Sequence, residues 1–381
     1  MRRRAWERDG EALLSVAIHS HSAYIEGTNW GSERLDQNFR RILIVRTDRI
    51  GDVILTLPMA RVLKKNSPSV RIAFLIQRYT SEIVESDPGV DQVMYYDDGR
   101  HSLPFFRLVA AIRREEFDVV FHTHPMFRLA LITRLARIPV RVGTGYRWYS
   151  FLFNRKVFEH RKDARKHELE YNLNLLEAVD CPVGSDDIVP TLRVAPESLK
   201  KAGEVLAGLG IERGRRFVLI HPGSGGSARD WSADNFGLLA RRLAELQDVR
   251  VVIAGSEAEE RLVRRVWELS AKRALVLAER LNLREYAALA KLASLFIANS
   301  TGPLHIAAAV GTPVIGLYPQ VTPLNATRWG PYTQKKTIFS PAGKPSDCSK
   351  CVGSGDGRCE CMDSIGVEEV FRAALAFLPN D

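Results

Sequence analysis

Residues 299–319 restrict the fold of this chain more than any other stretch. A wholly apolar run at 295–298 precedes them, which is typical of a strand buried on both faces of a parallel sheet. Ser300 and Thr301 can cap a short Ala-rich helix, and residues 314–318 form the next apolar run. A strand, a glycine-containing turn, a helix and a second strand make one βαβ unit. The sequence therefore predicts a parallel α/β sheet in this part of the chain.

The predicted helix begins at the carboxyl edge of that sheet, where open α/β folds bind phosphates. Its free N–H groups and positive dipole end would face an anion, and His305 lies within its first turn. A well-capped packing helix with a half-buried His305 explains the same residues. The local pattern alone supports an anion site and a packing role equally.

Length and composition indicate a globular protein of two domains. The 381 residues are 45% apolar and 26% charged, and no apolar run approaches the length of a membrane span. Three arginines follow Met1, but acidic residues stand where a signal peptide needs its apolar core. We therefore expect a cytoplasmic protein.

Strand-like and helix-like segments alternate in two series, which predicts two doubly wound α/β domains. The first series starts with an apolar strand at 41–46 and ends before a linker-like segment at 181–187. We expect an N-terminal extension with features of disordered sequence at 1–39, a Rossmann-like domain at 40–185 and a second one at 186–381. Two such halves joined by one linker place a site in the cleft between them.

Three short motifs at ordered positions carry a family resemblance. They are Ile-Val-Arg-Thr-Asp-Arg-Ile-Gly-Asp-Val-Ile-Leu-Thr-Leu-Pro at 44–58, His-Pro-Gly-Ser at 221–224 with Trp231 shortly after, and Ser-Thr-Gly-Pro-Leu-His at 300–305. Together they resemble glycosyltransferase family 9, the ADP-heptose:lipopolysaccharide heptosyltransferases, over about residues 41–375. The resemblance implies the GT-B architecture, in which two Rossmann-like domains face each other across a cleft. It also implies that the first domain binds the acceptor, the second binds the nucleotide sugar, and a final helix packs back on the first.

The activity that this resemblance implies is an inverting transfer of a heptose, or a related sugar, from ADP-heptose or another nucleotide sugar. The acceptor would be a lipopolysaccharide core or a related glycolipid, and no cofactor or tightly held metal would be required. The acceptor hydroxyl must lose a proton as it attacks, and the charge on the leaving diphosphate must be neutralised. Two alternatives stay open, a nucleotide-sugar isomerase or epimerase on the same fold and a non-enzymatic basic binding protein.

Asp52, in the first motif, matches the proposed general base of the family. A carboxylate at a helix N-terminus is stabilised as the anion, which makes it a weak base, and from spacing alone a helix cap explains Asp52 better. Arg229 occupies the place where the family often has a lysine that neutralises phosphate, so we predict that it is catalytic too. Arg46, Arg49 and Gly51 are the predicted acceptor-binding residues.

The donor side is expected on the second domain. Its Gly-rich turn after residue 221 can wrap oxygen-rich groups with N–H and hydroxyl donors. Ser300 replaces an aspartate that several relatives carry, so the donor sugar is open. Of the acids that follow the next strand, we assign Glu259 to the nucleoside ribose, although Glu257 and Glu260 fit the spacing equally. The predicted donor-binding residues are Ser224, Ser227, Glu259, Ser300, Thr301, Gly302 and His305.

Four of the five cysteines gather in one loop of the second domain, residues 348–361. Cys348, Cys351, Cys359 and Cys361 could supply four thiolates to a structural zinc, but the second pair is closer together than in a zinc knuckle. A disulfide is another alternative. Free thiols are favoured over both, because a cytoplasmic protein is kept reduced.

The net charge of +9, from 54 Lys and Arg against 45 Asp and Glu, favours acidic partners. We expect no nucleic acid, because the basic residues are dispersed and do not interleave with aromatic residues as a stacking platform would. A phosphorylated glycolipid acceptor suits the charge, and with it a peripheral contact with the inner face of the cytoplasmic membrane.

Overall fold

The computed structural model describes residues 39–184, 188–342 and 361–378. The chain forms two units, residues 1–33 and 34–381, and all the described residues belong to the second. The N-terminal extension predicted at 1–39 therefore lies outside the described residues except for its last position. Cys348, Cys351 and Cys359 lie outside them as well.

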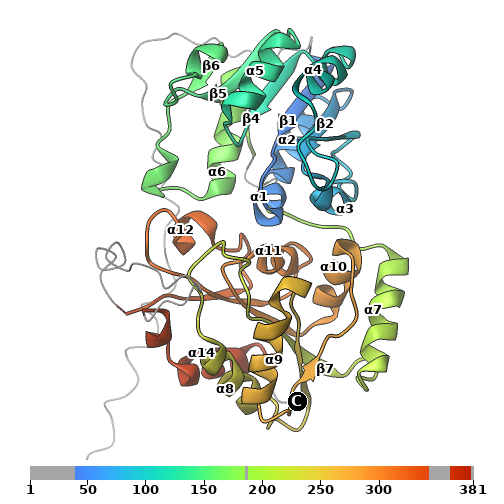
Figure 1. The fold of residues 1–381 in the computed structure, drawn as a ribbon, viewed down its shortest axis with the longest axis vertical. Coiled ribbons are helices and arrows are strands. Elements are labelled where there is room, and N and C mark those ends of the chain that lie inside the picture. The colour runs from blue at the N-terminus through green and yellow to red at the C-terminus, as the bar shows by residue number, and fades with distance from the viewer. Residues whose placement is uncertain (1–38, 185–187, 343–360, 379–381) are drawn as a thin grey trace, which may run out of the picture. The chain divides into compact units, whose positions relative to one another are not determined.

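The first half of the described chain contains a six-stranded parallel sheet, drawn in blue to green in Figure 1. Its strands run in the order β3-β2-β1-β4-β5-β6, so the direction of winding reverses between β1 and β4. The strands are β1 (Arg41–Val45), β2 (Arg71–Ile76), β3 (Gln92–Tyr95), β4 (Val119–His122), β5 (Val140–Thr144) and β6 (Arg155–Val157).

Helices cover both faces of this sheet because β1 is apolar on both sides. Ile42 and Ile44 face a core shared with α2 and α6, whereas Leu43 and Val45 face a core shared with α4 and α5. The predicted first strand is thus confirmed as the centre of a doubly wound sheet. The helices of this half are α1 (Ile50–Ile54), α2 (Leu57–Asn66), α3 (Ser81–Val84), α4 (Phe105–Arg114), α5 (Phe127–Leu135) and α6 (Glu168–Leu173).

The second half repeats the plan with a second six-stranded parallel sheet, in the order β12-β11-β10-β7-β8-β9. The strand and helix predicted around residues 295–310 are confirmed as β10 and α11, and β10 pairs in parallel with both β7 and β11. The strands are β7 (Arg216–His221), β8 (Val249–Ile253), β9 (Leu275–Val276), β10 (Leu295–Asn299), β11 (Val314–Leu317) and β12 (Lys336–Phe339). The helices are α7 (Pro196–Gly208), α8 (Ala233–Leu243), α9 (Glu260–Leu269), α10 (Leu283–Leu292), α11 (Gly302–Ala309), α12 (Ala326–Trp329) and α14 (Val367–Ala376).

The last helix, α14, packs on the second half, so the prediction that it packs back on the first domain is wrong. Val370 and Phe371 are buried in the core that α8 and α9 share with the second sheet. Arg242 of α8 donates a hydrogen bond to Glu368 at 2.6 Å, and the indole N–H of Trp231 donates to the carbonyl of Ile365 at 3.0 Å. These contacts place the apolar face of α14 where it covers the second sheet.

Side chains from both halves meet at the carboxyl edges of the two sheets, where α1 and α11 lie against each other (Figure 1). Arg328 of α12 contacts Glu168 at 2.9 Å, and Arg284 of α10 contacts Glu85 at 2.7 Å. A ring nitrogen of His167 lies 2.7 Å from the carbonyl oxygen of Gly330. The domain boundaries predicted near residue 185 stay a prediction.

Candidate functional site

Arg46 lies directly after β1 and is almost completely buried, with 2% of its side chain exposed. Its guanidinium contacts Asp48 at 2.7 Å and Glu168 at 3.0 Å, and it also pairs with Asp52. Three carboxylates compensate the cost of burying this one cation. The guanidinium of Arg46 is thus occupied by Asp48, Asp52 and Glu168, and its predicted role in acceptor binding stays a prediction.

Asp52 stands in the first turn of α1, but it does not cap the helix. Arg49 is the capping position and makes no side-chain cap, and the Asp52 carboxylate contacts Arg46 instead. Burial raises the pKa of Asp52 to about 6, although Arg46 acts in the opposite direction. The sequence predicted a carboxylate stabilised as the anion and thus a weak base. Burial and the repulsion from Asp48 and Glu168 act against the anion at this position, and the pKa is raised and not lowered as the sequence predicted.

The start of α11 brings neutral donors to the same place. Ser300 and Thr301 precede the helix, and the hydroxyl of Ser227 donates to the carbonyl of Ser300 at 3.1 Å. His305 is 5% exposed, and burial lowers its pKa to about 3. His305 is therefore neutral at physiological pH, so any contact that it makes with an anion is a hydrogen bond and not an ion pair.

The close approach of α1 to α11 depends on a glycine. A Cβ atom at Gly51 would lie only 2.7 Å from Cδ2 of His305, so no larger residue fits there without moving the histidine. Gly302 is also close to α1, since a Cβ atom there would lie 3.3 Å from Cβ of Ile50. Small residues on both sides thus let the two helix starts converge.

A cavity of about 280 Å³ lies between these helix starts, and most of the predicted site residues line it. They come from the loop after β1, from the Gly-rich turn after β7 and from the start of α11. Arg46, Ser224, Arg229 and Glu259 do not line it. The lining residues are Asp48, Arg49, Gly51, Asp52, Ser227, Ser300, Thr301, Gly302, His305, Leu324 and Trp329.

The Gly-rich turn after β7 rests on Glu259. The N–H of Gly225 donates to this carboxylate at 3.2 Å, and a Cβ atom at Gly223 would lie 1.9 Å from its Oε1. Burial disfavours the charged form, but hydrogen bonds from His221 and Ser256 hold the pKa of Glu259 at about 2. Glu257 points elsewhere and pairs with Arg280 at 2.8 Å. Of the acids left open by the sequence, Glu259 is thus the one that contacts the turn.

Besides Glu259, two predicted donor-side residues lie outside the cavity. Ser224 is buried, with 6% exposed, and its hydroxyl makes no hydrogen bond within the described residues. Arg229 is half-exposed, and the described part of the chain offers its guanidinium no hydrogen bond or ion pair. Asp230 follows it with a buried, unpaired Oδ1, and burial raises its pKa to about 6.

Glu168 is the residue that the sequence analysis missed. It is 1% exposed and contacts Arg46 at 3.0 Å, Arg161 at 2.7 Å and Arg328 at 2.9 Å. Burial disfavours its charged form, but Arg161, Arg46 and Arg328 together hold its pKa at about 2. No local pattern marks Glu168, because two of its three partners, Arg46 and Arg328, lie more than a hundred residues away in the sequence.

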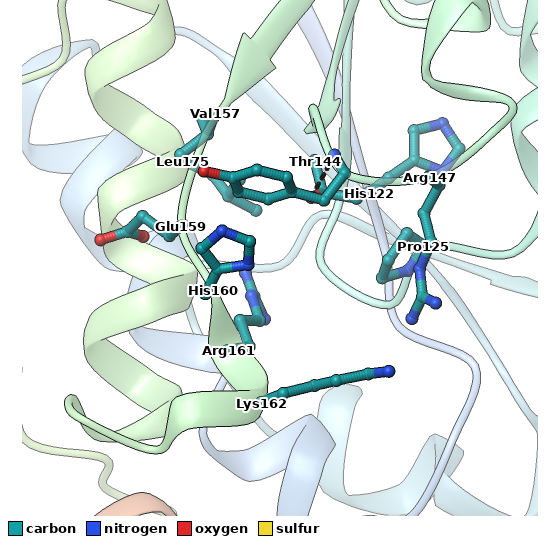
Figure 2. A pocket seen from close by; sticks show the side chains of 11 residues that line it. His122, Pro125, Thr144, Arg147, Val157, Glu159, His160, Arg161, Lys162 and Leu175 are labelled. Carbon is teal, nitrogen blue, oxygen red and sulfur yellow. Dashed lines mark hydrogen bonds between the residues drawn. The ribbon is translucent and has the colours of Figure 1, made fainter.

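A second cavity, of about 270 Å³, opens at the carboxyl edge of the first sheet (Figure 2). Tyr146 and His160 stack beside it with ring centroids 3.7 Å apart. Figure 2 shows the charged ends of Arg147 and Lys162 on the same side of this cavity. Arg161 lines its floor and also contacts Glu168, which in turn contacts Arg46.

Neither a metal cluster nor a membrane span is found in the part of the chain that the structure describes. No group of three or more His, Cys, Asp or Glu side chains there could hold a metal ion. No helix among the described residues is long and apolar enough to cross a membrane. The free thiols favoured at Cys348, Cys351, Cys359 and Cys361, and the alternatives of a zinc site or a disulfide, stay untested because only Cys361 lies in the described part of the chain.

Comparisons with known proteins agree with the motifs. A model of glycosyltransferase family 9 (heptosyltransferase) matches residues 105–356. Lipopolysaccharide heptosyltransferase 3 of Escherichia coli strain K12 is 28% identical over 346 residues, which cover 87% of this chain and 96% of that protein.

Solved structures share the fold. The structure of a glycosyltransferase family 9 protein from Veillonella parvula DSM 2008 matches with a TM-score of 0.75 at 22% identity, over 91% of this chain and 98% of that one. Heptosyltransferase WaaC of E. coli with ADP-2-deoxy-2-fluoro heptose matches with a TM-score of 0.63 at 20% identity, over 88% and 99%. These likenesses and the two wound sheets confirm the predicted GT-B architecture. Since the family model covers well over half of the chain, this protein belongs to glycosyltransferase family 9.

Proposed function

We propose that the protein transfers a heptose from ADP-heptose to a lipopolysaccharide-core acceptor, with inversion at the anomeric carbon. The single observation that carries this proposal is the cavity in which Asp52 faces the start of α11. A buried carboxylate and a set of neutral donors are the two groups that such a transfer needs. The names of the E. coli relatives support the heptose, the ADP and the lipopolysaccharide acceptor.

Asp52 acts as the general base in this proposal. With a pKa of about 6 it is mostly ionised at neutral pH, yet basic enough to take a proton from an acceptor hydroxyl. Arg46 fixes the orientation of the carboxylate, because it is itself held by Asp48 and Glu168. Arg49 and Gly51 line the same side of the cavity and contact the acceptor.

The start of α11 receives the diphosphate of the donor. The first N–H groups of an α-helix have no partner within the helix, and its dipole favours an anion there. Thr301 and Gly302 line the cavity at this helix start, with Ser227 and Ser300 beside them. The charge that develops on the leaving group is thus met by neutral hydrogen-bond donors.

Glu259 and Arg229 complete the donor side. Glu259 supports the Gly-rich turn and carries a negative charge at physiological pH, which suits a contact with the ribose hydroxyls. Arg229 is half-exposed and engages no other described side chain, so its guanidinium is available to the diphosphate once the donor is bound. The carbonyl of Ser224 stabilises the turn by accepting hydrogen bonds from the hydroxyl and the backbone N–H of Ser227, at 2.6 Å and 3.0 Å.

The test is a transfer assay with purified protein, a lipopolysaccharide core that lacks heptose, and a panel of ADP-, UDP- and GDP-sugars. We expect one heptose added per acceptor by mass spectrometry and one ADP released, only when ADP-heptose and the acceptor are both present. Conversion of the donor without an acceptor would instead indicate an isomerase, which the family match does not favour. Absence of transfer from every donor, with no thermal shift from ADP, would overturn the proposal.

A further inference from the structure

Exposed aromatic side chains gather on one part of the first half of the molecule. Trp148, Phe151 and Phe158 expose 73%, 69% and 63% of their surface, and Tyr146 and Phe127 expose 46% and 40%. We call these five residues the aromatic surface. Large rings left in water at this density mark a site of interaction and not a random scatter of apolar residues.

Four of the five rings of the aromatic surface contact one another in two pairs, and one pair also contacts a buried ring. The centroids of Phe127 and Trp148 lie 4.7 Å apart, and those of Tyr146 and Phe158 lie 5.6 Å apart. Tyr149, buried beneath them, contacts Trp148 at 5.5 Å and donates from its hydroxyl to the carbonyl of Pro125 at 2.7 Å. The rings are therefore held in place without being covered.

Positive charge surrounds these rings. Residues 141–166 contain eight Lys and Arg but only two Asp and Glu. Arg147, Arg155, Lys156 and Lys162 form no ion pair within the described residues, and Arg147 and Lys162 line the cavity of Figure 2 beside Tyr146. The expectation that basic and aromatic residues do not interleave is wrong for this segment, where they alternate.

We propose that the aromatic surface and these four cations dock the protein onto a lipid bilayer that contains anionic phospholipid. Trp and Tyr side chains favour the headgroup level of a bilayer, and Lys and Arg are attracted to its negative surface. The described residues hold no helix that could span a membrane, so the contact is peripheral. A nucleic acid suits the rings less well, because Tyr146 is already stacked on His160.

This inference rests on the proposed function for its purpose. Arg161 lines the cavity of Figure 2 together with Arg147 and Lys162, and it contacts Glu168 at 2.7 Å. Glu168 in turn contacts Arg46, which pairs with Asp52. The docking surface and the proposed base thus belong to the same half of the molecule. A glycolipid acceptor anchored in the bilayer would reach Asp52 without leaving the membrane.

The experiment is flotation of the full-length protein with vesicles of phosphatidylcholine alone or mixed with phosphatidylglycerol, at low and at physiological salt. We expect binding only to the mixed vesicles, weaker at the higher salt. W148S/F151S should weaken the partition coefficient at least about tenfold, and R147Q/K162Q about 30-fold. The matched controls L238S, on α8, and K200Q, on α7, replace a half-exposed leucine and an exposed lysine of the second half and should leave binding unchanged.

Binding to both vesicle types alike, no binding at all, or undiminished binding by both double variants would overturn the proposal. A self-association that W148S/F151S abolishes, seen by light scattering without vesicle binding, would assign the surface to a second copy of the chain.

Transfer to a deacylated, water-soluble acceptor separates this proposal from the proposed function. If W148S/F151S transfers normally to that acceptor and poorly to vesicles, docking is supported. If the wild type transfers to it but ignores vesicles, only docking fails.

Discussion

The two strand-to-helix turns that meet at the candidate site occupy the same place in their sheets and have opposite chemistry. The turn from β1 to α1 carries Arg46, Asp48 and Asp52, all of them ionisable and largely buried. The turn from β10 to α11 carries hydroxyls, glycine and a neutral histidine. In the proposed mechanism, one fold element thus serves proton transfer when charges are buried in it, and anion binding when only N–H and hydroxyl donors are left exposed.

The largest expected effect comes from removing the base from the first turn. Asp52→Asn keeps the size of the side chain and its contact with Arg46 but cannot take a proton, so kcat should fall by about 10²–10⁴-fold. Binding of ADP, which belongs to the second turn, should persist in a thermal-shift titration. Asp248→Asn, at an exposed ion pair with Arg215, is the matched control and should turn over normally. A D52N variant with the wild-type kcat would show that Asp52 is not the general base.

Glu168→Gln tests whether the charges of the first turn depend on one another. Three guanidinium groups would lose their shared carboxylate, so the free energy of unfolding should fall by about 3–5 kcal/mol in a urea titration. Glu168 also raises the pKa of Asp52 by repulsion, so the acid limb of the rate should move to lower pH. Glu245→Gln, an exposed partner of Arg273, should cost less than about 1 kcal/mol. An unmoved acid limb would mean that Glu168 is only structural.

The acid limb of kcat/KM in the wild-type enzyme should report Asp52 in the first turn. The pKa of Asp230, beside the Gly-rich turn, is also about 6, so Asp230→Asn is the control and should leave the limb in place. The pKa of Asp52 is raised in the folded protein, so the base is lost as the pH falls through about 6, and kcat/KM should then drop about tenfold per pH unit. His305 and Glu259 keep one charge state over this range. The measurement is a profile of kcat/KM from about pH 4 to about pH 8. This range spans the ordinary pKa values of carboxyl and histidine side chains. A limb near about pH 4 would show that the pKa of the base is not raised, and the D52N variant would then decide whether that base is Asp52.

The smallest expected effect comes from the Gly-rich turn beside the second helix start. Gly223→Ala places a methyl group against the Glu259 carboxylate, so the donor KM should rise about tenfold while kcat changes little. Gly203→Ala on α7 is the matched control, since nothing lies within 4 Å of its added Cβ atom. Equal effects of G223A on kcat and KM would indicate that the turn also supports the transition state.

The sequence determined the fold and most of the cavity lining, because both depend on short local patterns of residues. Apolar runs of strand length, the hydroxyls before α11 and the order of the motifs each depend on a few neighbouring residues. Parallel strands then bring their carboxyl ends to one edge of a sheet without further information. Asp52, Ser227 and Thr301 could thus be predicted to meet.

The tertiary structure alone decided the electrostatics and the outlying contacts. The sequence put the pKa of Asp52 too low because burial, which is the largest cause of the raised pKa, depends on all the elements packed around the site. Arg46 became internal and Glu168 became its partner through a contact that spans 122 residues. The placement of α14 on the second half likewise follows from which apolar face was left uncovered. The burial of a side chain depends on every element that packs around it, so no single stretch of sequence can predict it.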